Sequence, residues 1–276
     1  MKKLLKRIVD YMLTDRKVLH VTVNEINYGG VLKDKNIVIT GGGSGIGYAM
    51  AQKFVNEGAQ VLLIGRKERK LSEACSKLGC NARYIVFDIS DIENYTKLFD
   101  MILSKYTRID AFVCNAGISL HEGCIENVSI EGYTAQIDTN LKANYFISKK
   151  LVEYHKNVQT PLDILYISSS TSNQPYDLPY GMAKSALNSL VQKLNKRYYS
   201  SGIRVNAIAP GIIPTEITKS YADVEDGNMY INESCGRYFL ASEIAEVATF
   251  LLSGASKIIG GEVINCDGGL TQKRIW

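Results

Sequence analysis

The chain has 276 residues, of which 46% are hydrophobic and 22% charged, and its formal net charge is +4. This composition is typical of a globular chain long enough for one large α/β domain. The small, dispersed charge excludes a dedicated nucleic-acid-binding protein, and no apolar stretch approaches the roughly 18 residues that cross a bilayer. The six cysteines show no C-x-x-C pair or metal spacing, which indicates reduced thiols, a cytoplasmic location and no metal site.

Residues 1–34 precede the regular part of the chain and are expected to form an extension. Apolar residues recur at helical spacing over 1–13 beside basic residues, which predicts a basic amphipathic helix. Charges interrupt the apolar run and no small-residue cleavage site follows, so a signal peptide is not indicated. The helix is expected to pack on its own domain or on a neighbouring subunit, with a membrane-surface helix as the alternative. A short strand would then follow over 19–23.

From residue 35 onward, β-branched runs alternate with segments of helical periodicity. The predicted strands are 36–40, 60–65, 83–87, 111–115, 163–168, 204–209 and 262–266. The predicted helices are 46–56, 69–78, 92–105, 134–158, 180–199 and 241–252. Strands separated by helices indicate a parallel sheet with helices on both faces. Seven strands predict a doubly wound, Rossmann-type sheet in a single domain over 35–276, whose ligand lies beyond the carboxyl ends of the strands.

The first predicted strand runs directly into a glycine cluster, G-G-G-S-G-I-G over 41–47, and then into a helical pattern. This is the strand–turn–helix context that a dinucleotide-binding loop requires. Glycines let the backbone approach a pyrophosphate, and the helix N-terminus supplies unpaired N–H groups. The alternative is a glycine-rich turn that binds no ligand.

Tyr180 and Lys184 lie four residues apart at the start of a predicted helix, so their side chains project from one face. A phenol titrates near pH ~10 and a lysine near ~10.4, so neither alone suits proton transfer near neutrality. A neighbouring ammonium stabilises the phenolate and brings the tyrosine closer to a useful pKa. The pair is therefore a candidate acid/base group.

Taken together, these motifs and several others make the chain resemble the short-chain dehydrogenase/reductase family, in particular its 3-oxoacyl-reductase-like branch. The resemblance runs from about residue 35 to the C-terminus. The residues that carry it are Thr40, Gly41, Gly45, Gly47, Asp88, Asn115, Ala116, Gly117, Asn140, Ser168, Ser169, Ser170, Tyr180, Lys184, Arg204, Asn206, Pro210, Gly211, Thr215, Asp267, Gly268 and Gly269. So many ordered matches are a far stronger signal than any single motif.

The resemblance implies an NAD(P)-dependent oxidoreductase that interconverts a carbonyl and an alcohol. Tyr180 would be the general acid/base, Lys184 its electrostatic partner, Ser169 the group that orients the carbonyl, and Asn140 the support of a proton relay. A dinucleotide-binding regulatory protein without turnover and a membrane-docked reductase of a hydrophobic ketone are the alternatives. The family also implies a homotetramer or homodimer, built here on the helices over 134–158 and 180–199.

The choice among the three serines stays open. Counted from the preceding strand, Ser169 takes the catalytic place of the family. The eleven residues from Ser169 to Tyr180 are about two fewer than the family usually has, so the intervening segment is shortened. Ser168 and Ser170 therefore remain alternatives.

The resemblance also implies where a dinucleotide would be held. Asp88 would accept a hydrogen bond from the adenine amino group, and Pro210, Gly211 and Thr215 would line the nicotinamide. Cys114 departs from the asparagine that is common in the family and is interpreted as a small buried hydrophobic residue. The expected cofactor-binding residues are Thr40, Gly41, Gly43, Ser44, Gly45, Ile46, Gly47, Arg66, Lys67, Asp88, Ile89, Asn115, Ala116, Gly117, Tyr180, Lys184, Pro210, Gly211, Ile213 and Thr215.

The second predicted strand bears on the choice of cofactor. NAD-preferring enzymes of this fold carry a carboxylate at its end, and Gly65 stands there instead. Arg66 and Lys67 follow, and a guanidinium binds phosphate in a fork. Ser44 counts against this preference, because many NADP-dependent relatives carry a basic residue there. NADP is therefore the predicted cofactor, with NAD as the alternative.

The substrate is a small carbonyl or alcohol whose identity the sequence does not specify. A 3-oxoacyl thioester, a keto-sugar or polyol, and a hydrophobic ketone or steroid all fit the resemblance. The segment over about 215–234 is polar and irregular, which is typical of a lid over a substrate site.

Overall fold

The computed structural model describes residues 18–22, 26–218 and 228–271. The predicted N-terminal helix and the middle of the predicted lid lie outside these residues. Within the part of the chain that the structure describes, no helix is both long and apolar enough to span a membrane.

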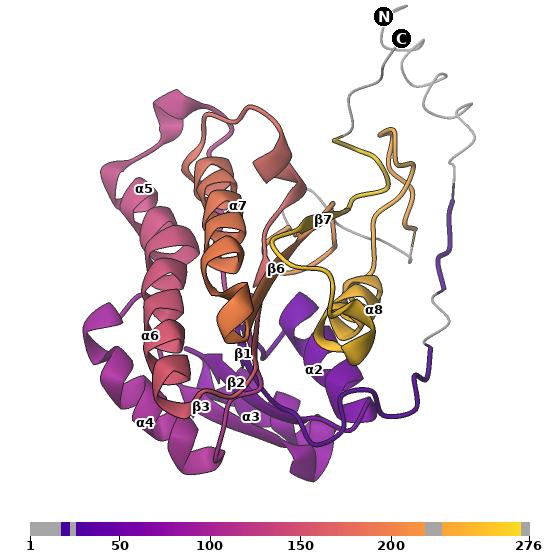
Figure 1. Ribbon diagram of the computed structural model, residues 1–276. Helices are drawn as coiled ribbons and strands as arrows, with labels where there is room; N and C mark the ends of the chain where they lie inside the picture. The colour runs from indigo at the N-terminus through magenta and orange to yellow at the C-terminus, as the bar shows by residue number, and fades with distance from the viewer. Residues whose placement is uncertain (1–17, 23–25, 219–227, 272–276) are drawn as a thin grey trace, which may run out of the picture.

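Seven strands form one parallel sheet, as predicted (Figure 1). The strands are β1 (Asn36–Thr40), β2 (Gln60–Gly65), β3 (Ala82–Val86), β4 (Ala111–Cys114), β5 (Leu162–Ile167), β6 (Ile203–Pro210) and β7 (Val263–Cys266). Their order is β3-β2-β1-β4-β5-β6-β7. The direction of winding reverses between β1 and β4, where Val38 pairs with Phe112. In an open parallel sheet, a ligand binds at this reversal, beyond the carboxyl ends of the strands.

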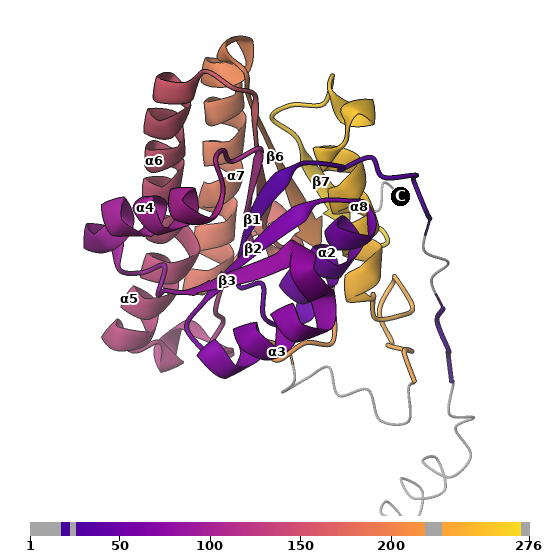
Figure 2. The ribbon, with the colours of Figure 1, turned by 90° about the horizontal axis from the view of Figure 1, so that it is seen from below.

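Helices cover both faces of the sheet, which confirms the doubly wound architecture (Figure 2). The helices are α2 (Gly45–Asn56), α3 (Glu68–Leu78), α4 (Tyr95–Lys105), α5 (Ile130–Ile137), α6 (Ala143–Val158), α7 (Pro179–Tyr198) and α8 (Ala241–Leu252). One hydrophobic core joins the sheet to α4, α6 and α7, and the other joins it to α2, α3 and α8. Neighbouring residues of β1 serve opposite cores, Val38 the first and Ile39 the second, because side chains alternate along a strand. With both faces covered, the strands are apolar almost throughout.

The predicted helix over 134–158 differs from the observed one at its start and in its continuity. Helix α5 begins at Ile130, because the Ser129 hydroxyl accepts a 2.9 Å hydrogen bond from the N–H of Gly132 and caps it. A π-helical segment, Asp138–Lys142, then separates α5 from α6. The helix predicted over 92–105 also begins differently, with a short 3₁₀ turn, Ile92–Asn94, before α4. Other boundaries lie within two residues of those predicted.

The described part of the N-terminal extension runs along the outside of the domain. The strand predicted over 19–23 is not formed by its described residues, 19–22. Leu19 makes one backbone hydrogen bond to Met229 instead of a ladder, so the segment stays extended without joining the sheet. Further along, Glu57 of the α2 C-terminus accepts hydrogen bonds from the N–H groups of Tyr28 and Gly30.

Candidate active site

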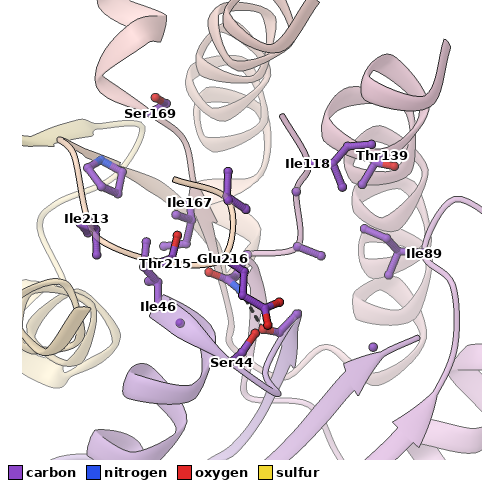
Figure 3. A pocket seen from close by; sticks show the side chains of 18 of the residues that line it. Ser44, Ile46, Ile89, Ile118, Thr139, Ile167, Ser169, Ile213, Thr215 and Glu216 are labelled. Carbon is purple, nitrogen blue, oxygen red and sulfur yellow. Dashed lines mark hydrogen bonds between the residues drawn. The ribbon is translucent and has the colours of Figure 1, made fainter. Parts of the chain in front are cut away.

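A pocket opens beyond the carboxyl ends of the parallel strands, where the sheet topology predicts a ligand (Figure 3). Its walls come from the glycine loop after β1, the turns after β2 and β3, the loop after β4, the serine segment after β5 and the segment after β6. Residues separated by more than a hundred positions in sequence therefore face one cavity.

The glycine loop forms a tight cradle at the start of α2. Gly41 and Gly45 have φ angles of +67° and +55°, a region that residues with a Cβ rarely adopt. A Cβ at Gly47 would overlap the carbonyl oxygen of Gly41, so the first turn of α2 packs against the loop only because residue 47 is glycine. The Ser44 side chain makes no capping hydrogen bond, and Ser44, Gly45 and Ile46 line the pocket. Backbone approach and an uncapped helix N-terminus suit a pyrophosphate.

Thr40 and Asn115 join the ends of β1 and β4. The Thr40 hydroxyl accepts 3.0 Å hydrogen bonds from the backbone N–H groups of Asn115 and Ala116. The Asn115 side-chain amide donates to the carbonyl oxygens of Thr40 at 2.9 Å and of Gly41 at 3.2 Å. Thr40 is fully buried and does not line the pocket, whereas Asn115 and Ala116 do. This network fixes the two loops between which a dinucleotide would lie.

Tyr180 and Lys184 lie on the first turns of α7 and both line the pocket. The Lys184 Nζ lies 5.6 Å from the centroid of the Tyr180 ring and donates a 2.7 Å hydrogen bond to the Ile167 carbonyl oxygen. Lys184 is only 3% exposed, and burial lowers its pKa to about 8. The ammonium form still predominates near pH 7, so a positive charge stands beside the phenol.

Asn140 is fully buried within the π-helical segment. Its side-chain amide donates to the carbonyl oxygens of Ile118 at 2.8 Å and Gln136 at 2.9 Å, and its Oδ1 accepts from the N–H of Ile118 at 3.2 Å. A Cβ at Gly117 would lie 2.7 Å from Asn140 Oδ1 and 3.6 Å from Lys184 Nζ. Asn140 thus holds the loop after β4 close to Lys184, and only glycine fits between them. Asn140 itself does not line the pocket.

The three serines after β5 have different surroundings. The Ser168 hydroxyl donates a 2.7 Å hydrogen bond to Asn188 Oδ1 of α7, so it serves the packing of that helix. The Ser169 hydroxyl accepts hydrogen bonds from the N–H of Thr171 at 3.2 Å and the Thr171 hydroxyl at 2.9 Å. Both bonds use the oxygen as acceptor, which leaves its hydrogen for a substrate oxygen. Ser168 and Ser169 line the pocket, and Ser170 is buried outside it.

At the β2–β3 end of the pocket, Arg66 and Asp88 face each other. Arg66 Nη1 lies 3.7 Å from Asp88 Oδ2, and both side chains are well exposed, so the ion pair is weak. The other oxygen of Asp88 accepts hydrogen bonds from the N–H of Ser90 at 3.0 Å and its hydroxyl at 2.8 Å. These bonds fix the carboxylate and leave the guanidinium able to reach a ligand.

The family model described as "Enoyl-(Acyl carrier protein) reductase" matches residues 41–271. A 3-oxoacyl-(acyl-carrier-protein) reductase of Chlamydia trachomatis is 31% identical over 247 residues, which cover 87% of this chain and 99% of that protein. A glucose 1-dehydrogenase of Gluconobacter oxydans is 32% identical, covering 86% and 92%. The crystal structure of a 3-ketoacyl-(acyl-carrier-protein) reductase from Brucella melitensis, complexed with NADH, has a TM-score of 0.80 at 27% identity, covering 87% and 99%.

The chain belongs to the short-chain dehydrogenase/reductase family. It is an NAD(P)-dependent oxidoreductase that interconverts a carbonyl compound and its alcohol. The prediction of an enzyme is thereby confirmed over the alternative of a regulatory protein without turnover. A nicotinamide dinucleotide is its cofactor, and the glycine cradle and uncapped helix start of this dehydrogenase/reductase fit the pyrophosphate of such a group.

Most of the site residues predicted for this dehydrogenase/reductase face one cavity. Those that line it are Gly41, Ser44, Gly45, Ile46, Arg66, Asp88, Ile89, Asn115, Ala116, Gly117, Ser169, Tyr180, Lys184, Pro210, Gly211, Ile213 and Thr215. Five others do not line it: Thr40, Gly43, Gly47, Lys67 and Asn140. Thr40, Gly47 and Asn140 support the lining from behind, and Gly43 packs on Leu71. Lys67 is the N-cap residue of α3.

The sequence prediction missed several lining residues of this dehydrogenase/reductase. They are Ile64, Gly65, Phe87, Ile118, Thr139, Ile167, Glu216, Ile217 and Thr218, of which the last three lie in the segment predicted as a lid. Each of them lies within three positions of a predicted site residue. Ser168, which was kept as an alternative catalytic serine, also lines the pocket. The carboxylate of Glu216 lies beside Ser44 (Figure 3) and forms an ion pair with Lys70 of α3. No local sequence pattern predicts this ion pair, because Lys70 and Glu216 are 146 positions apart.

Two further features of this dehydrogenase/reductase lie outside the lining of the pocket. Tyr176, in the shortened segment before α7, packs on Gly181, where any Cβ would overlap its ring. Cys114 is 1% exposed, and burial raises the pKa of its thiol, so it is the small buried residue that was predicted. Among the described residues, no group of three or more histidines, cysteines or carboxylates could hold a metal ion.

Proposed function

We propose that Tyr180, Lys184 and Ser169 carry out the reversible reduction of a carbonyl compound in this pocket. The observation that carries the proposal is the position of Lys184 Nζ, 5.6 Å from the Tyr180 ring and bonded to the Ile167 carbonyl oxygen. A bound nicotinamide would supply or accept the hydride. The chain itself must bind the substrate oxygen, stabilise its developing charge and exchange a proton with it.

In the proposed roles, the Tyr180 hydroxyl gives its proton to the substrate oxygen during reduction and takes it back during oxidation. The Lys184 ammonium stabilises the resulting phenolate, because a positive charge close by in a buried site favours the ionised form. The Ser169 hydroxyl donates a hydrogen bond to the same oxygen, since its own bonds to Thr171 use only its acceptor capacity. Asn140 keeps the backbone of Ile118 and Gly117 close to Lys184.

We propose NADP as the preferred cofactor. Gly65 ends β2 without a carboxylate, so nothing at that position repels a 2′-phosphate. Arg66 lines the pocket, and its weak ion pair with Asp88 leaves the guanidinium able to bind a phosphate in a fork. Because Lys67 does not line the pocket, Arg66 is the basic residue to which we assign the phosphate. NADH in the Brucella melitensis relative supports the alternative, NAD.

For the substrate, we propose a carbonyl compound with an apolar chain, such as a 3-oxoacyl thioester, over a keto-sugar. Ile118, Ile213 and Ile217 line the pocket on the loops that flank the catalytic pair. Glu216 is the acidic lining residue of the segment after β6, and it lies toward Ser44 instead (Figure 3). A sugar needs several hydrogen-bonding groups around its hydroxyls, whereas these walls are largely aliphatic. The acyl reductases among the relatives support the same choice.

We also propose a homotetramer or homodimer built through α6 and α7. Large apolar side chains are exposed on and beside these helices, among them Tyr145 at 53%, Met182 at 40% and Tyr133 at 45%. Exposed apolar patches of this kind mark association surfaces. The cytoplasmic location is likewise a proposal, and six unpaired cysteines support it, because a reducing compartment keeps thiols free.

The proposed activity is tested by following NADPH and NADH oxidation with a panel of 3-oxoacyl thioesters, keto-sugars and apolar ketones. We expect turnover with NADPH and the acyl thioesters, and weaker turnover with the other two classes. Turnover confined to keto-sugars would contradict the proposed substrate class but would leave the proposed roles of Tyr180, Lys184 and Ser169 standing. No turnover with any carbonyl, in protein that binds the cofactor, would contradict both.

A further inference from the structure

The N-terminal extension lies outside the match to the family model. The family model begins at residue 41, and relatives that align over 97% to 99% of their own length cover 87% of this chain. The described residues of the extension, 18–22 and 26–34, nevertheless make specific contacts at two places. One is the end of α2, and the other is the segment that follows the pocket wall after β6.

We infer that the described residues of the extension, 18–22 and 26–34, form a strap that positions the substrate end of the pocket, with Leu19 as the positioning residue. The strap contacts the C-terminal end of α2 through residues 26–30 and a hairpin over 229–238 through Leu19, and Phe239, directly after that hairpin, is bonded to the segment after β6. The inference deepens the proposed function and rests on it in one respect, namely that the β6 side of the pocket holds the substrate.

The first anchor of the strap is a buried cluster of charges at the end of α2. Glu57 is 1% exposed, and its two carboxylate oxygens accept hydrogen bonds from the N–H groups of Tyr28 at 3.0 Å and Gly30 at 3.1 Å. Lys53 forms ion pairs with Glu57 at 3.2 Å and Glu246 at 3.1 Å, and it donates to the Ile26 carbonyl oxygen. This cluster ties residues 26–30 to both α2 and α8.

The pKa shifts of Glu57 and Lys53 agree with the hydrogen bonds and ion pairs of this cluster. Burial alone would raise the pKa of Glu57, but the hydrogen bonds from Tyr28, Lys53 and Gly30 outweigh it and lower the pKa. Burial alone would lower the pKa of Lys53, but its bonds to Glu246 and Glu57 raise it. Both groups are therefore charged at neutral pH, and releasing the strap would leave Glu57 buried without its two backbone donors.

The second contact is made at Leu19. Its carbonyl oxygen accepts a 2.8 Å hydrogen bond from the N–H of Met229, and its own N–H donates a 3.0 Å hydrogen bond to Asn228 Oδ1. These two bonds hold Leu19 beside the start of the hairpin. They span more than two hundred positions of sequence, so they bring the N-terminal part of the chain to the segment after β6.

Hydrogen bonds of the hairpin and of Phe239 link Met229 to the segment after β6. The Met229 carbonyl oxygen accepts a 2.8 Å hydrogen bond from the N–H of Tyr238, and Tyr230 bridges Arg237 across the turn. The next residue, Phe239, donates a 2.9 Å hydrogen bond from its N–H to the Ile212 carbonyl oxygen. Its ring also covers Gly211, where a Cβ would approach within 2.8 Å of a ring atom.

The base of the hairpin is itself held rigidly. Arg237 forms a two-pronged ion pair with Glu243 of α8, with N–O distances of 2.9 Å and 2.6 Å. The same carboxylate accepts a 2.8 Å hydrogen bond from the N–H of Leu240. Leu19 therefore holds the end of the hairpin that lies away from α8. If its bond to Met229 is lost, we expect the hairpin to loosen and Phe239 to hold the Ile212–Ile213 segment less firmly.

This arrangement separates two ends of the pocket. Arg66 and Asp88 follow β2 and β3, whereas the wall that the strap supports follows β6, four strands from β2 in the sheet. Loosening the strap should affect the substrate end and leave the β2–β3 end unchanged. The proposal thus predicts weaker substrate binding with unchanged nucleotide binding. A general loss of stability would weaken both.

The test uses the full chain with Leu19→Pro, which removes the N–H that bonds Asn228. Val18→Pro is the matched control, because Val18 is exposed and its N–H makes no hydrogen bond among the described residues. Asn228→Ala removes the acceptor of the same bond, and with it the 3.1 Å hydrogen bond that Asn228 Oδ1 accepts from the N–H of Tyr230. Amide hydrogen exchange is measured at Met229, Tyr238 and Phe239, together with the Kd for ADP and the KM for the carbonyl substrate.

We expect Leu19→Pro and Asn228→Ala to raise exchange at these three amides by about tenfold, the effect of losing one net hydrogen bond. The KM for the carbonyl substrate should rise several-fold while the Kd for ADP stays the same, and Val18→Pro should do neither. Unchanged exchange in both variants would overturn the inference, as would raised exchange with an unchanged KM. If Leu19→Pro unfolds the chain, Asn228→Ala decides, because the three amides that are read, Met229, Tyr238 and Phe239, do not include the Tyr230 amide that Asn228 itself binds. If the wild-type protein binds no ADP, the proposed function is wrong. The exchange measurement still tests the strap in that case, because it does not depend on activity.

Discussion

Lys184 and Tyr180 are held in a fixed relationship: the lysine Nζ lies 5.6 Å from the centroid of the tyrosine ring. The geometry is fixed because the same nitrogen donates a 2.7 Å hydrogen bond to the carbonyl oxygen of Ile167, at the end of β5. The ammonium is buried, so little solvent screens its effect on the phenol. A lysine that merely carried charge at the surface would not lie in this position.

Burial of Lys184 has a consequence for stability that depends on pH. Its pKa is about 8 in the folded chain, against an ordinary value of 10.5. Between these values the unfolded chain holds more protons, so the stability of the wild type should rise with pH through this window. The total gain is roughly 3 kcal/mol, at about 1.4 kcal/mol for each pKa unit.

Chemical denaturation of wild type and Lys184→Met near pH ~7 and near pH ~10 measures this effect. The difference in unfolding free energy should shift in favour of the wild type at the higher pH. Lys149→Met, on the exposed side of α6, is the control for general alkaline effects. If the difference in unfolding free energy between wild type and Lys184→Met does not change with pH, burial does not lower the pKa of Lys184.

The serine series tests the assignment of Ser169. Ser169→Ala should lower kcat by about 10²-fold, the scale of losing one hydrogen-bond donor to a developing oxyanion. Ser170→Ala should have little effect, because Ser170 is outside the pocket. Ser168→Ala should cost about 1 kcal/mol of stability through the lost bond to Asn188, with a smaller effect on kcat. If Ser170→Ala is the damaging change, the assignment is wrong.

Arg66 is the proposed cause of NADP preference. Arg66→Ala should weaken NADPH binding by about tenfold and leave NADH binding nearly unchanged, since only NADPH carries the phosphate that the guanidinium would bind. Titration of both nucleotides into wild type and variant gives the ratio of the two Kd values. Tighter binding of NADH by the wild type would refute the preference, and an unchanged ratio in the variant would remove Arg66 as its cause.

Lys70 and Glu216 should influence dinucleotide binding through their ion pair. Glu216 lines the pocket near Ser44, and Lys70 neutralises it from α3. Lys70→Met removes the ammonium that faces this carboxylate, so a bound pyrophosphate would meet more negative charge. We expect NADPH affinity to fall roughly three- to tenfold, a modest effect because Glu216 is largely exposed. Glu216→Gln should restore the affinity in the double variant, and a failure to restore it would exclude the carboxylate as the cause.

The local motifs of the sequence gave the strongest predictions. The strand, the glycine loop and the start of α2 adjoin one another, so their spacing alone identifies a dinucleotide-binding loop. Tyr180 and Lys184 share one helix face, which the four-residue spacing predicts directly. The seven strands were readable because both faces of the sheet are buried, which makes each strand an apolar run.

Relationships between distant segments were not readable in the same way. The ion pair of Lys70 with Glu216 and the contact of Leu19 with Met229 depend on the path of the chain after β6 and before β1. The π-helical segment around Asn140 was predicted as continuous helix, because a one-residue shift in hydrogen bonding leaves the apolar periodicity almost unchanged. Tyr176 and Gly181 meet only because the loop between them is short.

Tyr180 is the proposed proton donor, and Tyr180→Phe removes the hydroxyl that would carry the proton. Wild type and variant are compared for the Kd of NADPH and for kcat with the best substrate from the carbonyl panel. The phenyl ring keeps the packing but lacks the hydroxyl, so we expect an unchanged Kd and a loss of kcat of about 10³-fold or more, within the usual range for removing a positioned acid. A variant that turns over at a rate close to that of the wild type would contradict the account.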